Sequence, residues 1–281
     1  MSLTRAARYG YLSARCRTIR SRLLDRAALQ ELAATRSVGE LFAALAVTPY
    51  GPYLSAVSAE GIHTALADAF VSRRDSVTRA LGKGDRELVR LFFDAKYRLL
   101  DEKFAQAQSA HPEEAFRRID REYLSTLERG IRRVPGPEQR HLRRMIGSYC
   151  DLLNLYNLVK LRLLYRRSIE ETLAFMLPGG EALSMEGLAS LCLVEGLSQL
   201  SDRVEPLLGE GFGDYESFRK ALYRYHRRHL DAVWSGYPFS IAHPFALLRL
   251  LEIETADLRA ITEGIAAGLE SGEIIAMTVG V

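Results

Sequence analysis

Apolar residues recur every three to four positions along almost the whole chain, and this spacing most limits the possible folds. The segment RYGYLSARCRTIRSRLLD (residues 8–25) places Leu12, Ile19 and Leu23 near one stripe of a helix. Strand-like character is confined to the closing run IIAMTVGV (residues 274–281), which is short and terminal. The spacing therefore predicts an all-α protein.

Short Gly- and Pro-rich segments separate the periodic stretches. They are TPYGPY (48–53), GKG (82–84), VPGP (134–137), LPGG (177–180), GEGFGD (209–214) and SGYPF (235–239). Such clusters mark loops between helices, and none is long enough to link separate domains. A chain of 281 residues can bury a sizeable core without stabilisation by disulfides or metal ions. Three cysteines, none in a CxxC motif, indicate a reducing compartment without disulfides or zinc.

One apolar helix carries unexpected polar residues. The segment YCDLLNLYNLVKLRLL (residues 149–164) contains Asp151, Asn154 and Asn157 among leucines. Asp151 and Asn154 lie one turn apart on the same face. A catalytic or ion-binding polar line is one interpretation. We favour a structural one, in which these groups pin the helix to a loop, because buried polar atoms are nearly always hydrogen-bonded. Loss of Asp151 should then cost about 1–3 kcal/mol.

The same pattern occurs in two other long apolar helices. Glu254 is followed by Asp257, and Asp94 by Tyr97, each three residues later. Three versions of one helix type suggest a degenerate threefold repeat. The expected units are residues 1–107, 108–170 and 171–281. The predicted structural pins are Asp94, Asp151, Asn154, Asn157, Glu254 and Asp257.

No group of residues indicates an enzyme or a cofactor site. His226, His229 and Asp231 could approach a metal, but Arg227 and Arg228 between them would repel a cation. We therefore interpret this segment as a solvated helix face. The chain has no nucleophile elbow, no phosphate-binding loop after a strand and no paired zinc motif. We expect no catalytic residue, no cofactor and no metal.

The charges are unevenly distributed along the chain. Residues 1–24 are rich in arginine and free of acids, a composition shared by organellar transit peptides. We interpret them as a mature basic helix, because their apolar spacing continues into the next segment. Residues 250–273 carry six acids and one arginine. A basic head and an acidic tail suggest two different contact surfaces.

Two further possibilities are a helical adaptor of another assembly and a basic nucleic-acid-binding protein. The arginine clusters of residues 116–134 and 141–144 could contact phosphates. However, acids are interleaved with the arginines, and no stacking aromatic residues accompany them as an RNA platform would need. No apolar run approaches the roughly 20 residues of a membrane span.

Several segments, in order, resemble the C subunit of V/A-type rotary ATPases, the family that includes eukaryotic V-ATPase subunit d. They are YGYLSARCRTIRSRLL (9–24), LAVTPYGPYL (45–54), FFDAKYRLL (92–100), YCDLLNLYNLVKLRLLYR (149–166), FMLPGGEALSMEGLASL (175–191), FGDYESFRKAL (212–222) and the segment from YPFSIAHPF to AITEG (237–264). This similarity covers most of the chain.

The resemblance implies a funnel of helices with pseudo-threefold symmetry and no chemistry of its own. Such a subunit belongs to the central stalk, where it couples the shaft to the membrane proteolipid (c/K) ring and transmits torque for proton or sodium transport. The implied partners are that ring, shaft subunits of the D and F type and the membrane stator subunit, at a cytoplasmic, peripheral location on the ring. The candidate interface residues are Tyr9, Tyr11, Arg15, Arg17, Tyr223, Arg227 and Arg228.

Overall fold

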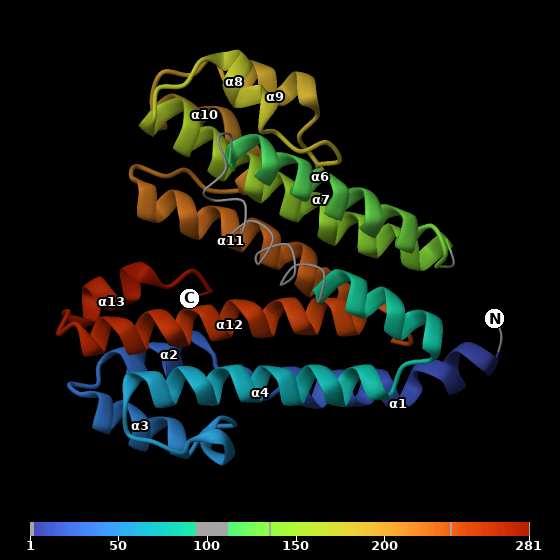
Figure 1. The fold of residues 1–281 in the computed structure, drawn as a ribbon, viewed down its shortest axis with the longest axis vertical. Coiled ribbons are helices and arrows are strands. Elements are labelled where there is room, and N and C mark those ends of the chain that lie inside the picture. The colour runs from blue at the N-terminus through green and yellow to red at the C-terminus, as the bar shows by residue number, and fades with distance from the viewer. Residues whose placement is uncertain (1–2, 94–111, 135, 237, 281) are drawn as a thin grey trace.

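The computed structural model describes all residues except 1–2, 94–111, 135, 237 and 281 (Figure 1). Within the described residues the structure is helical and contains no strand. The predicted all-α class is therefore confirmed. The closing run that looked strand-like forms a helix up to Met277.

The helices follow one another through short loops. The first half of the chain contains α1 (Leu3–Arg20), α2 (Arg26–Ala33), α3 (Val38–Ala46), the 3-10 turn η1 (Gly51–Tyr53), α4 (Ala59–Arg79), a helix over residues 83–93, and α6 (Pro112–Ile131). The second half contains α7 (Gly136–Leu158), η2 (Val159–Leu164), α8 (Ile169–Ala174), α9 (Met185–Leu191), α10 (Leu197–Leu208), α11 (Tyr215–Ala232), η3 (Val233–Ser235), α12 (Ala242–Ala266) and α13 (Ser271–Met277).

Helix α12 is the centre of the molecule. Nineteen of its 25 residues are buried, as expected of a helix that is apolar on nearly all sides. It packs against α1, α2, α3, α4, α7, α11 and α13. In Figure 1, α1, α4 and α12 run side by side in one group, and α6 to α10 form the other, with α11 between them.

The buried apolar residues form three clusters. The largest lies where α1, α4 and α12 meet the start of α7. The second lies between α7 and the four helices α8, α9, α10 and α11. The third joins α2, α3 and α13 to α4 and α12. The largest cluster draws residues from all three expected units. The division at residues 107 and 170, the threefold relation and the funnel shape remain predictions.

Helix starts follow their local sequence. Ser168 and Glu171, three residues apart at the start of α8, form a capping box, in which each side chain accepts a hydrogen bond from the other residue's backbone. Ser37 caps α3 by accepting from the Glu40 N–H at 3.2 Å. The Glu40 carboxylate, however, accepts from Arg36 N–H and not from Ser37 N–H, so the capping box is incomplete.

Helix α7 ends in a widened π-helical turn, η2, which the periodicity did not indicate. The Arg162 guanidinium fixes this turn by donating to the carbonyls of Cys192 at 3.1 Å and Arg167 at 3.2 Å. Arg166 then adopts a left-handed backbone with φ of 55°, which is uncommon for a residue other than glycine. The long helix therefore stops abruptly before α8.

Candidate functional site

Asp151 lies fully buried at the middle of a hydrogen-bonded cluster. Its Oδ2 accepts from the backbone N–H groups of Glu181 at 3.1 Å and Ala182 at 3.0 Å, and its Oδ1 accepts from Leu183 N–H at 3.2 Å. The Tyr225 hydroxyl donates to the same carboxylate at 2.7 Å. One side chain on α7 thus holds both the loop before α9 and helix α11.

Asn154, one turn further along α7, holds the start of the same loop. Its amide donates to the Leu177 carbonyl and accepts from the Leu177 N–H, both at 2.8 Å. Asn157 is half-buried, and its side chain makes no hydrogen bond among the residues that the structure describes. The three polar residues of this helix are therefore not equivalent.

Glu254 and Asp257 occupy similar positions on α12. The Glu254 carboxylate accepts from Leu24 N–H at 2.7 Å and from the Tyr50 hydroxyl, and Arg73 lies 3.9 Å away. Asp257 accepts from the N–H groups of Val279 at 2.7 Å and Gly280 at 2.8 Å. Asp94 and Tyr97, the third predicted pair, lie outside the described residues.

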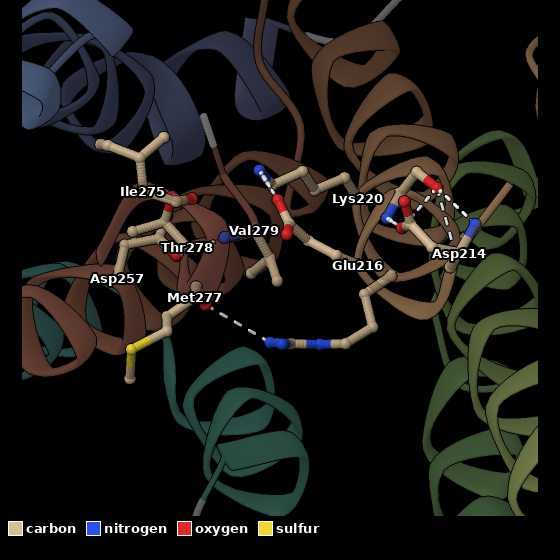
Figure 2. A network of polar contacts seen from close by, with 10 residues as sticks. Asp214, Glu216, Lys220, Asp257, Ile275, Met277, Thr278 and Val279 are labelled. Carbon is tan, nitrogen blue, oxygen red and sulfur yellow. Dashed lines mark hydrogen bonds and ion pairs between the residues drawn. The ribbon is translucent and has the colours of Figure 1, made fainter. Parts of the chain in front are cut away.

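Helix α11 also holds the last residue of α13 and the segment that follows it. Figure 2 shows Asp257 beside Thr278 and Val279. A separate dashed line in the same view ends on the Met277 carbonyl. That contact comes from the Arg219 guanidinium at 3.4 Å. Arg227 donates to the Gly280 carbonyl at 2.8 Å. The end of the chain is therefore fastened to two long helices.

The anchors on α7 and α12 correspond at a constant separation in sequence. Asp151 and Glu254 are 103 residues apart, as are Asn154 and Asp257. Asp151 and Glu254 each accept a hydrogen bond from a tyrosine hydroxyl. Asn154 and Asp257 each accept from a backbone N–H that lies 23 residues later in the chain, at Leu177 and Gly280 respectively.

The same separation relates whole helices. Shifted by 103 residues, α6 overlaps α11, α7 with η2 overlaps α12, and α8 overlaps α13. Three successive helices therefore correspond in length and spacing. Such an extended correspondence makes it improbable that the two polar motifs match by chance. Residues 112–174 and 215–277 are therefore organised alike.

The candidate interface residues differ widely in exposure. Tyr9 is only 4% exposed and donates to Asp85 at 2.8 Å, whereas Tyr11 is 68% exposed. Arg15 and Arg17 are exposed on α1, where Arg15 donates to Ser76 and Arg17 to the Trp234 carbonyl. On α11, Tyr223 and Arg227 are half-buried, and the exposed Arg228 donates to the Leu208 carbonyl at 2.7 Å.

The expectation of a solvated face at His226 was wrong. His226 is 1% exposed, and its Nδ1 lies 2.9 Å from the Ser148 hydroxyl. Arg249, also buried, stacks over the Tyr149 ring and pairs with Glu252 at 2.6 Å. Arg227 and Arg228, which follow His226 in sequence, lie on other sides of the helix. The charge of these neighbours therefore did not indicate that His226 is buried. His229 and Asp231 are half-buried, and Asp231 pairs with Arg20 at 2.9 Å.

The described part of the chain contains neither a group of potential metal ligands nor a helix suited to span a membrane. No three His, Cys, Asp or Glu side chains are grouped so as to hold a metal ion. None of its helices combines the length and the apolar character that a membrane span needs.

Comparison with protein families gives a direct match. The model of the ATP synthase (C/AC39) subunit family matches residues 86–277, about two thirds of the chain. The chain belongs to this family. A comparison with curated proteins finds no match. The family match ends at the last residue of α13 and spans both 103-residue-related units, so the anchors on α7 and α12 lie in the part that defines the family.

The partners of the anchors were not evident from sequence. Tyr225 and Tyr50 stand 74 and 204 residues from the acids they bind, in segments without a recognisable signal for that contact. The loop glycines were the available clue. A Cβ on Gly180 would overlap the Asp151 carboxylate, and one on Gly280 would lie 2.5 Å from Asp257 Oδ2.

Burial controls the ionisation of the α12 anchors. It raises the pKa values of Glu254 and Asp257, although the Tyr50 hydroxyl and backbone N–H donors oppose that rise. A carboxyl whose pKa is higher in the folded state stabilises the fold fully below its unfolded-state pKa and loses that contribution as pH rises through the folded-state pKa. His243, whose pKa burial lowers to about 4, has the opposite dependence.

We therefore expect Glu254→Gln to flatten the pH dependence of stability. The difference in unfolding free energy between parent and variant should shrink as pH rises from about 4, the usual carboxyl pKa. Urea unfolding at a series of pH values measures this difference, and His243 cancels because both proteins contain it. The variant keeps one side-chain oxygen, so one of the two donors, Leu24 N–H or the Tyr50 hydroxyl, loses its acceptor, and this adds a constant cost. Parallel curves for the two proteins would contradict the expected ionisation of Glu254.

Proposed function

We propose that this C/AC39 family subunit is a non-catalytic central-stalk component of a V/A-type ATPase or ATP synthase. It couples the central shaft, made of D- and F-type subunits, to the proteolipid ring and transmits torque between them. Its place is on the cytoplasmic side, peripheral to the membrane and seated on the ring, near the stator subunit. The family match over residues 86–277 carries this proposal.

The anchors support a mechanical role. A part that transmits torque must keep its helices and loops in one arrangement under load. Asp151, Asn154, Glu254 and Asp257 each bind backbone of a distant segment from a buried position. We propose that these residues, with Asp94 in the same role, are structural pins and not a reactive site, and that Asn157, which has no side-chain hydrogen bond among the described residues, contributes little.

The related units support the proposed architecture. The 103-residue correspondence relates residues 112–174 to residues 215–277, which overlap the second and the third proposed units. The helix over residues 83–93 lies within the first proposed unit, directly before Asp94. We propose that the three units, within residues 1–107, 108–170 and 171–281, surround a funnel. Its contact surfaces would include the exposed side chains of α1, namely Tyr11, Arg15 and Arg17, and those of Tyr223, Arg227 and Arg228 on α11. Tyr9 would support that surface from beneath.

Purification from the native host tests the assignment. The chain is tagged at its own locus, membranes are extracted in mild detergent, and the proteins that co-purify are identified by mass spectrometry. We expect the catalytic A and B subunits, the shaft subunits and the proteolipid in stable proportion. The control is the untagged host carried through the same extraction. Recovery of the chain alone, with nucleic acid, or with an unrelated assembly would contradict the rotor role.

A further inference from the structure

A cavity of about 310 Å³ opens between α1, the loop around η1 and α4. These elements lie against one another at the end of the molecule that contains α2 and α3 (Figure 1). Its lining includes the apolar side chains of Ile19, Leu23 and two prolines. It also includes Arg15, Arg22 and Arg73 together with the hydroxyl-bearing side chains of Thr48, Tyr53, Ser72 and Ser76. The volume is within the range of small-molecule sites.

The charge of this cavity is unbalanced. No carboxylate lines it among the described residues. Arg15 and Arg22 form no ion pair within the part of the chain that the structure describes, and both are exposed. Arg73 has one carboxylate nearby, that of Glu254 at 3.9 Å, which already accepts from Leu24 N–H and Tyr50. Three guanidinium groups therefore converge with at most one shared counter-charge behind them.

Two of the three arginines are already held in position. The Arg73 guanidinium stacks over the Tyr50 ring, 4.3 Å from its centroid, and donates to the Pro49 carbonyl at 3.3 Å. Arg15 donates to the Ser76 hydroxyl across the groove between α1 and α4. Holding a guanidinium in place reduces the entropy lost on binding an anion, and its fork of donors matches phosphate oxygens.

We propose that this cavity binds a phosphate-bearing ligand. Three cations and several hydroxyl donors exceed what one carboxylate requires, whereas a phosphate group offers several oxygens and more than one negative charge. The apolar side chains of Ile19 and Leu23 in the lining would contact the organic part of the ligand. The phosphate can come from a soluble organic phosphate or from a lipid headgroup. This inference does not depend on the proposed rotor function.

Calorimetric titration of the full chain with pyrophosphate and with ADP, at low salt, tests the proposal. We expect saturable binding at one site. Arg22→Ala, which removes an exposed side chain without an ion-pair partner, should weaken binding by about tenfold or more, as should Arg15→Ala. The matched control is Arg140→Ala, which removes an exposed arginine on α7 that has no side-chain hydrogen bond or ion pair within the described structure. It should bind like the parent.

Further arms identify the source of the phosphate and the ways in which the idea fails. If pyrophosphate and ADP do not bind but phosphatidylglycerol vesicles do, with the same loss in Arg22→Ala, the phosphate belongs to a lipid. The proposal is overturned by absence of binding to all three probes, or by equal losses in Arg22→Ala and Arg140→Ala. It is also overturned if a glutamate-rich peptide binds through these arginines and the phosphate probes do not.

Discussion

Asp151→Ala is expected to lower the free energy of unfolding by about 3–4 kcal/mol. The sequence alone indicated about 1–3 kcal/mol. The structure raises that expectation because the carboxylate accepts from three backbone N–H groups and a tyrosine hydroxyl. The loss should stay below the sum of four separate hydrogen bonds, because the effects of contacts that share one group are not additive.

Urea or thermal unfolding followed by circular dichroism measures this effect. Asn157→Ala is the matched control, because Asn157 lies on the same helix without a side-chain hydrogen bond among the described residues. It should cost less than about 1 kcal/mol. If Asp151→Ala unfolds like the parent, Asp151 does not anchor the loop.

Gly180→Ala is expected to cost about 2–4 kcal/mol through overpacking at the same anchor. A Cβ at this position would overlap Asp151 Oδ1 and lie 2.7 Å from the Leu183 carbonyl oxygen. Neither group can move freely, because Asp151 is held by four donors and the carbonyl is backbone. The loop must therefore shift and lose part of its hydrogen bonding to α7.

The control for this variant is Gly272→Ala in α13, where an added Cβ meets no atom within 4 Å. That variant should keep or slightly raise the unfolding free energy, because alanine favours helix over glycine. The double variant Gly180→Ala with Asp151→Ala separates the causes. If the overlap with the carboxylate is responsible, Gly180→Ala should cost much less in that background. An unchanged cost would assign the effect to the Leu183 carbonyl alone.

The fold class followed from the sequence because helical periodicity and loop residues are local properties. The Ser168 capping box was predictable for the same reason. The π-helical turn η2 was not, because a change of hydrogen-bond register after Leu158 depends on the Arg162 contact with Cys192, 30 residues away.

The same distinction between local and tertiary information applies to the anchors. Polar residues in an apolar helix pointed to buried, paired groups at Asp151, Asn154, Glu254 and Asp257. Their partners required the tertiary structure, since Leu24 lies 230 residues from Glu254. The His226 environment was predicted wrongly because the charged neighbours of a helical residue in sequence lie on other faces of the helix.

The cluster on Asp151 has a consequence for how the protein resists force. The three hydrogen bonds from the loop N–H groups share one acceptor group, so a pull that separates the loop from α7 loads them in parallel and not in succession. Hydrogen bonds loaded in parallel share the force, stretch little and break together, whereas hydrogen bonds loaded in series break one after another. The joint therefore acts as a stiff spring, and elastic strain from repeated loading would collect in neighbouring parts and not at this point.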